Sequence, residues 1–224
     1  MDIPTAACTS RSKTKSFFGL LLLTLLTGWG CGPDSIAYQS FQDARVVNDL
    51  RLSGKIDSST FVGAEGVAIL EIGGGGFGIG MMGGHGVAMR RLDGAWSAPL
   101  PLDYISGSIG LQIGGKTADI LLVFRSADSF DDFVFNGTRF IAEASGTAIR
   151  ATGAAGDPMK AGETTVISIV KGLYGGAVIG GLGVSIDEKL MRKSYGEGTG
   201  PRDVLDGSIK AMAGAESLWS AINH

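Results

Sequence analysis

The chain has 224 residues, and a composition of 44% hydrophobic and 18% charged residues excludes wholesale disorder. Its formal charge of -3 excludes a chain built mainly to wrap nucleic acid. Two cysteines and two histidines leave little material for disulfides or metal sites. Glycine is unusually frequent, at 37 of 224 residues, or about one in six, against a usual share of about 7%. These glycines do not recur at every third position, which excludes collagen.

The first thirty residues have the pattern of a secretory signal peptide. A basic stretch at 11–15 precedes an apolar run at 17–26, which is too short to span a bilayer as a helix. We predict a leader over 1–30 and one domain over 31–224.

Cys31 directly follows a small residue at the end of this leader, as in a bacterial lipoprotein lipobox. We therefore predict that Cys31 is lipidated and that the protein is membrane-anchored in a bacterial periplasm, with the outer membrane favoured. The alternative is ordinary cleavage after Gly30, which leaves a soluble periplasmic or secreted protein. Removal of the leader takes away three basic residues and one acidic residue and leaves a charge near -5.

The first predicted element after the leader is a helix over 36–52, ended by Gly54. Its apolar stripe is expected to contain Ile36, Phe41, Ala44, Val47 and Leu50, with Asp43, Arg45 and Asp49 outside the stripe.

Downstream of Gly66, valine, isoleucine and methionine runs broken by glycine are typical of strands. Strands are expected within 66–100, with a turn at 93–94, and at 118–124, 139–150 and 164–186, the last as a hairpin. Ser129 is expected to cap a short helix that reaches Phe135, and two more helices are expected at 187–195 and 203–222.

Glycines inside strands are tolerated where backbones approach closely or where a sheet curls. The many glycines of this chain predict an α+β fold, in which a curved, glycine-rich antiparallel sheet or half-barrel is flanked by N- and C-terminal helices.

Two segments imitate nucleotide-binding motifs. Residues 110–117 satisfy the Walker A pattern, but the segment that follows, 118–124, is typical of a strand and not of the helix that the motif requires. Residues 78–83 imitate a dinucleotide fingerprint, again without a following helix. We interpret both as products of the glycine content and predict no cofactor.

Catalytic residue types are scarce. His85 could serve as a general base, but a structural or surface histidine is the favoured interpretation. Paired acids at 131–132 could suggest a metal clamp, although acids in the first turn of a helix already complement its dipole. We predict no metal site and no enzymatic activity.

A set of short motifs, in a fixed order over roughly residues 40–215, resembles the SYLF-domain family, a lipid-binding module also found in yeast actin-patch proteins. The matching stretches are 76–80, 84–87, 96–99, 107–114, 119–124, 171–176 and 195–196. The family also places a glycine-rich segment before an Asp-led strand, as this chain does at Asp119.

This resemblance implies binding of acidic phospholipids and, in some members, of actin. Lys171 is the first candidate because it lies inside a matched motif, and Arg45, Arg90 and Arg91 are the others. These basic residues could form a local patch, and each is worth about 1 kcal/mol near an anionic leaflet. The alternative is that they are scattered, solvated charges.

We therefore predict a non-catalytic envelope lipoprotein that binds acidic phospholipid head groups. Its expected partners are anionic phospholipids and the membrane that holds its anchor, without nucleic acid, and with actin only by family analogy. The alternatives are a structural or stress-related envelope protein without lipid specificity, and a hydrolase-type enzyme that uses His85.

Overall fold

The fold was determined as a computed structural model, which describes residues 33, 35–136, 140–141, 150–151, 163–172, 183–212 and 214–223. Side chains are described at these positions except at 75–81, 106–116, 140–141, 150–151 and 170–172. The predicted leader and Cys31 lie outside the described residues. The helices are α2 (Ile36–Leu52), α3 (Ala127–Asn136), α4 (Glu188–Tyr195), α5 (Pro201–Leu205) and α6 (Ala215–Asn223). The strands are β1 (Gly66–Leu92), β2 (Ala95–Trp96), β3 (Leu100–Phe124), β4 (Phe140–Ile141), β5 (Arg150–Ala151), β6 (Thr164–Gly172) and β7 (Gly183–Ile186).

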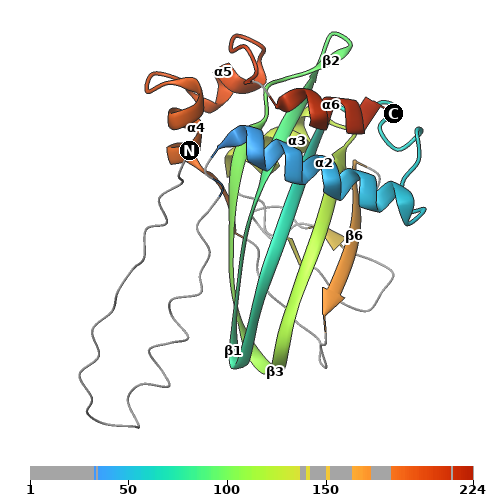
Figure 1. The fold of residues 1–224 in the computed structure, drawn as a ribbon, viewed down its shortest axis with the longest axis vertical. Helices are drawn as coiled ribbons and strands as arrows, with labels where there is room; N and C mark the ends of the chain where they lie inside the picture. Colours follow the sequence, from blue (N-terminus) through green and yellow to red (C-terminus); the bar gives the residue numbers. More distant parts are fainter. Residues whose placement is uncertain are drawn as a thin grey trace, which may run out of the picture. The chain divides into compact units, whose positions relative to one another are not determined.

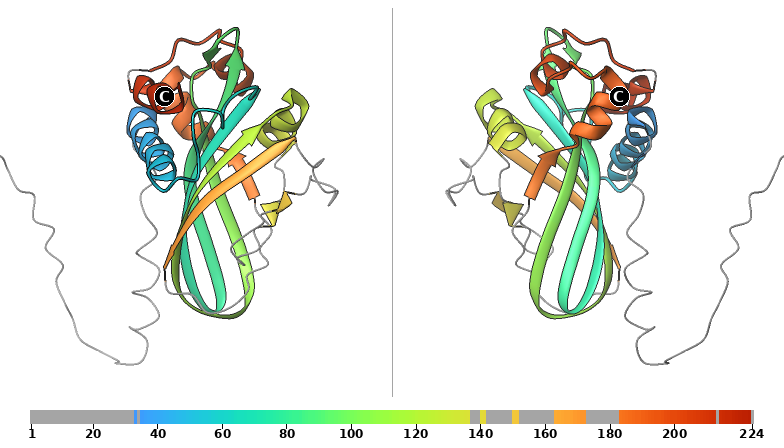
Figure 2. Two further views of the ribbon diagram at one scale, coloured as in Figure 1. Left: turned by 90° about the vertical axis from the view of Figure 1, so that its right-hand side faces the viewer. Right: turned by 90° about the vertical axis from the view of Figure 1, so that its left-hand side faces the viewer.

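The main sheet is built around two very long antiparallel strands, β1 and β3. They pair from Gly66 opposite Phe124 to Ala88 opposite Leu100, with one register shift between Phe77 and Ile79. The sheet order is β2-β1-β3-β6, and β7 also pairs with β3. Both long strands run away from the helices, bend, and return (Figures 1 and 2). The predicted α+β fold with a curved antiparallel sheet is confirmed.

Two glycines show why the ribbon can fold back on itself. A Cβ atom added at Gly86 would overlap the carbonyl oxygen of Ile69, and one added at Gly84 would overlap that of Glu71. The returning half of β1 therefore crosses its outgoing half with the two backbones in direct contact, as the glycine-rich sequence predicted.

Both nucleotide-like segments belong to these strands. Residues 110–117 lie inside β3, where Lys116 pairs with Gly74, and residues 78–83 lie inside β1. The prediction that a strand follows the Walker-like segment is confirmed, because β3 continues without interruption to Phe124.

The helices cover two sides of the ribbon (Figure 2). On one side, α2 and α6 pack with alternate strand residues such as Val67, Ile69 and Leu121. We call this the α2 cluster. On the other side, α3 and α5 pack with the intervening residues, such as Ala68 and Leu70. We call this the α3 cluster. Alternation is possible because successive side chains of a strand point to opposite faces.

The predicted helix over 36–52 is confirmed, with the Ser35 hydroxyl accepting a hydrogen bond from the Tyr38 amide at 3.2 Å. Gly54, at φ 68°, follows its end. Two residues were placed on the wrong side of this helix. Phe41, predicted to be buried, is 54% exposed, and Asp43, predicted to lie outside the apolar stripe, is fully buried. Buried positions at 36, 40, 43, 47 and 50 keep strict three- and four-residue spacing, which Phe41 does not.

The helix that was expected to begin at Ser129 begins at Ala127 instead. The Ser126 hydroxyl accepts from the Ser129 amide at 3.4 Å, whereas the Ser129 hydroxyl donates to the Glu163 carboxylate at 2.6 Å. Ser126 therefore caps the helix, and Ser129 ties it to the segment that precedes β6.

The C-terminal predictions are partly wrong. The helix predicted over 187–195 is confirmed as α4, but the helix predicted over 203–222 is divided into α5 and α6 by glycines with positive φ at Gly207 and Gly214. The predicted hairpin over 164–186 is also wrong where it is described, because β6 and β7 pair with different parts of β3. Of the strand predicted over 139–150, the described part is β4 and the start of β5, which pair with each other.

Candidate functional site

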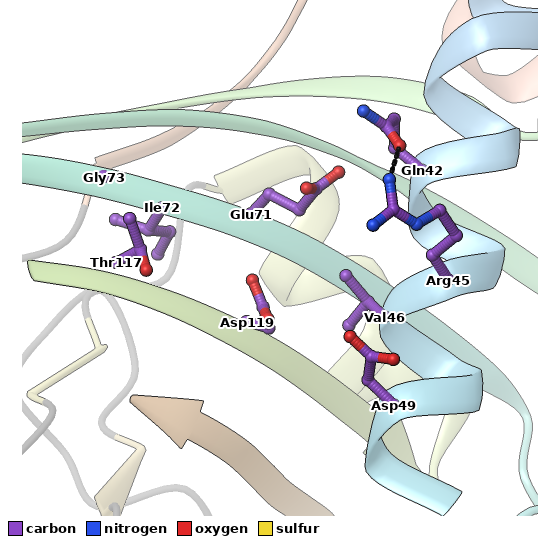
Figure 3. A pocket seen from close by; sticks show the side chains of 9 residues that line it. All are labelled: Gln42, Arg45, Val46, Asp49, Glu71, Ile72, Gly73, Thr117 and Asp119. Carbon is purple, nitrogen blue, oxygen red and sulfur yellow. Dashed lines mark hydrogen bonds between the residues drawn. The ribbon is translucent and has the colours of Figure 1, made fainter. Parts of the chain in front are cut away.

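A hollow of about 330 Å³ opens where α2 crosses β1 and β3 (Figure 3). The helix contributes Arg45 and Asp49, and the strands contribute Glu71 and Asp119. The remaining lining residues are Gln42, Val46, Ile72, Gly73 and Thr117. We call this the α2 hollow. It is polar on both walls, although apolar residues surround it on the same face of the sheet.

Like charges face each other on the floor of the α2 hollow. Glu71 lies directly opposite Asp119 in the β1–β3 register, and both are half-buried. Burial raises the pKa of Glu71, the Asp119 carboxylate raises it further, and Arg45 and His85 lower it. Arg45 is exposed and donates to the Gln42 amide oxygen at 3.1 Å. The carboxylates outnumber the one guanidinium, which makes this hollow a poor seat for an anionic head group.

A second carboxyl lies under α2. Asp43 is fully buried, and its Oδ1 accepts a hydrogen bond from Gln39 Nε2 at 3.0 Å. Within the described part of the chain, its Oδ2 has no hydrogen-bond partner. Burial raises the pKa of Asp43 well above its ordinary value, and the Glu71 carboxylate adds to the rise. The sequence analysis missed this residue, although its spacing from Ile36, Ser40 and Val47 is that of the buried stripe.

His85 has a structural partner. It lies opposite Asp103 in the β1–β3 register, and its Nδ1 is 2.8 Å from Asp103 Oδ1. Both side chains are about a third exposed. The pair fits both a structural histidine and a base that is oriented by a carboxylate. It supplies a base with an orienting carboxylate but brings no nucleophile to the ring within the described hydrogen bonds.

The candidate lipid-binding arginines do not gather in one place. Arg90 stacks on Phe130, with 5.1 Å from its guanidinium carbon to the ring centroid, and forms an ion pair with Asp131. Arg91 stacks on Trp96 at 4.9 Å. Phe130 and Trp96 belong to different clusters, so the two arginines leave opposite faces of β1.

The other two basic candidates lie elsewhere. Arg45 is on α2, at the α2 hollow. Lys171 is in β6, opposite Thr117, and its side chain lies outside the described set. The acid pair at 131–132 is used within the fold, because Asp131 binds Arg90 and Asp132 accepts from Asn136 at 2.6 Å.

An exposed aromatic pair on α2 was also missed by the sequence analysis. Tyr38 is 55% exposed and Phe41 is 54% exposed, and they lie one helical turn apart. Arg45 follows Phe41 by four residues and is therefore on the same side of the helix. We call these three residues the α2 outer face. Large exposed aromatic side chains at this spacing are typical of a contact surface.

Among the residues that the structure describes, no helix is both long enough and apolar enough to cross a bilayer.

The chain is similar in sequence to proteins of yeast and of mammals. The Ysc84 family, described as "Las17-binding protein actin regulator", matches residues 105–224. Protein YSC84 of Saccharomyces cerevisiae is 28% identical over 162 residues, which are 69% of this chain and 35% of that protein. LAS seventeen-binding protein 3 of the same yeast is 27% identical over 166 residues, 71% of this chain and 36% of that protein.

Mammalian relatives give a similar picture. Human SH3 domain-containing YSC84-like protein 1 is 26% identical over 165 residues, covering 71% of this chain and 48% of that protein. The chain thus spans only a third to a half of the length of these relatives. No solved structure gives a significant match. The SYLF resemblance read from the motifs is confirmed, and the chain belongs to the Ysc84 (SYLF) family.

Proposed function

We propose that this domain is a non-catalytic module that binds acidic phospholipid head groups through the α2 outer face. The observation that carries the proposal is the exposed pair Tyr38 and Phe41 beside Arg45. Aromatic rings favour the interface between head groups and acyl chains, and a guanidinium on the same side favours anionic phosphates. Such a face suits a membrane surface better than it suits bulk water.

The electrostatic part of this binding is weak by itself. Without the predicted leader the chain carries a net charge near -5, and one arginine near an anionic leaflet supplies about 1 kcal/mol. We therefore propose that an acyl chain on Cys31 supplies the rest. Ile36 follows Cys31 by five positions, which allows at most about 18 Å of extended chain. An anchor at Cys31 would hold the α2 outer face within reach of the membrane.

Vesicle co-sedimentation of the domain without its leader tests the proposal. Tyr38→Ser combined with Phe41→Ser should lower partitioning onto vesicles of phosphatidylcholine and phosphatidylglycerol by about tenfold or more, because two rings leave the interface. Ile105→Ser is the matched control, because Ile105 is an equally exposed hydrophobic residue on β3. Partitioning that does not depend on phosphatidylglycerol content and salt would reject recognition of acidic head groups. Equal losses in both variants would reject binding through the α2 outer face.

The proposed anchor has its own test. Metabolic labelling with a fatty acid in a bacterial host should mark the full-length protein and should be lost in Cys31→Ser. Cys8→Ser is the matched control, since Cys8 lies within the predicted leader. Equal labelling of the full-length protein and of Cys31→Ser would contradict lipidation at Cys31.

A second candidate is contact with a protein of the actin-assembly machinery. The observation in its favour is the family description and the name of one yeast relative, which both state Las17 binding. In this reading, the α2 outer face would bind a protein segment in place of a lipid surface. Saturable binding to an actin-assembly protein, lost in Tyr38→Ser/Phe41→Ser, together with no vesicle binding, would favour it.

A further inference from the structure

Asp43 is the buried polar group that the fold and the proposed function leave unexplained. Its carboxyl is completely covered by the interface between α2 and the sheet, and Oδ2 has no hydrogen-bond partner within the described residues. Ser40, one turn earlier and equally buried, likewise has an unpartnered hydroxyl in this part of the structure. A buried carboxylate without a cation is strongly unfavourable, whereas the neutral acid is tolerated.

The charges around Asp43 do not compensate it. From the sheet, Glu71 and Asp119 add negative charge beneath the helix, and His85 is paired with Asp103. Of the two arginines of α2, Arg45 is exposed and bonded to Gln42. Asp49 adds one more carboxylate at the α2 hollow.

The helices packed against α2 bring their own charged groups. Glu216 of α6 accepts a hydrogen bond from the Gly214 amide at 2.7 Å. Arg51, the second arginine of α2, donates to the Ala221 carbonyl oxygen of α6 at 2.8 Å. The charged residues of α4 are Glu188, Lys189, Arg192 and Lys193, of which Arg192 pairs with Glu188. Glu71 is the charged group that acts most directly on Asp43.

We propose that Asp43, buried between α2 and the sheet and acted on by the Glu71 carboxyl, which itself faces Asp119, forms an acid-strengthened latch that holds α2 on the sheet. When protons neutralise Asp43 and Glu71, the interface buries neutral dipoles in place of like charges. When they ionise, repulsion and desolvation loosen α2 locally, while the β1–β3 ribbon remains folded. The latch is independent of lipid binding, although α2 also carries the outer face proposed to contact the membrane.

The direction of the pH effect follows from the shifts of Asp43 and Glu71. Both folded-state pKa values are raised above the ordinary values of 3.8 and 4.5. The folded protein therefore keeps protons at pH values where the unfolded chain has lost them. Stability from these groups is fullest below the unfolded pKa values and falls as pH rises toward the folded ones.

Hydrogen exchange of the full chain, corrected for intrinsic exchange rates, tests the latch at about pD 5.5 and pD 8.0. Protection of α2 amides should be about tenfold higher at the acidic condition, because the folded protein retains more of the protons on Asp43 and Glu71 there than at pD 8.0. Asp43→Asn keeps the oxygen that accepts from Gln39 but cannot ionise. It should raise α2 protection at pD 8.0 and remove most of the pD dependence.

Asp93→Asn is the matched control, because Asp93 is exposed in the turn between β1 and β2. It should behave as the unmodified protein. If Asp43→Asn does not fold, Glu71→Gln provides the second variant, with a smaller change in the same direction. Equal pD dependence of α2 and β3 amides, or an unchanged profile in both variants, would overturn the latch.

Discussion

Gly84 and Gly86 are the residues on which the doubled ribbon depends. An added Cβ atom at these two positions would overlap backbone oxygens of Glu71 and Ile69, whereas at Gly198 it would meet no atom within 4 Å. A backbone carbonyl in the middle of a paired strand cannot move aside as a flexible side chain can. An added methyl group therefore has to separate the two halves of β1.

Gly86→Ala should lower the free energy of unfolding by about 3 kcal/mol, at the upper end of the usual cost of overpacking. Urea denaturation followed by circular dichroism measures this loss. Gly198→Ala is the control, since a Cβ at Gly198 meets no atom within 4 Å. A Gly86→Ala protein as stable as the Gly198→Ala protein would contradict the close crossing of the two backbones.

Residues of α2 show where sequence reasoning worked and where it did not. The helix itself was predictable from its hydrophobic spacing and from Gly54. Its buried stripe was misjudged at Phe41 and Asp43, because residue polarity was weighed above spacing. The exposed Phe41 of the α2 outer face and the buried carboxyl of Asp43 were both missed for this one reason. Residues that break the rule of apolar inside and polar outside are common at functional positions.

At the scale of elements, local sequence signals predicted where helices and strands lie better than they predicted which strands pair. Ser126 and Ser129 are both plausible caps three residues apart, and the choice between them depends on Glu163, which comes from a distant segment. Likewise, 164–186 has the texture of a hairpin, yet β6 and β7 find their partners along β3. A strand of 25 residues can pair with both, and nothing local to 164–186 reveals its length.

The division of the predicted C-terminal helix has a local cause that the glycines of the sequence could have indicated. Gly207 and Gly214 adopt positive φ, which glycine permits at little cost. Gly207 follows the end of α5, and Gly214 directly precedes α6. Gly214 also lies against Ala37 at the start of α2, where an added Cβ would lie 2.8 Å from the Cβ and 3.0 Å from the Cα of Ala37. This contact helps place α6 beside α2, in agreement with Figure 1.

At the scale of the whole domain, the two hydrophobic clusters share the same strands. Val67 and Ile69 belong to the α2 cluster, and Ala68 and Leu70 belong to the α3 cluster. Neither cluster can lose its strands without exposing the other. Between the two described clusters there is therefore no boundary that separates independently stable halves, which is why the acid-strengthened latch is expected to release α2 and not to open the sheet.

This sharing predicts one cooperative unfolding transition. Phe133→Ala, at a fully buried position of α3, should lower the free energy of unfolding by about 3–5 kcal/mol. The same loss should appear in far-ultraviolet circular dichroism and in the fluorescence of Trp96 and Trp219, which belong to the opposite cluster, in a Trp29→Phe background. Val62→Ala, at an exposed position, is the control and should leave both signals unchanged. If the tryptophan transition kept its original midpoint while the circular dichroism transition moved, the two clusters would unfold separately, and the shared strands would not couple them.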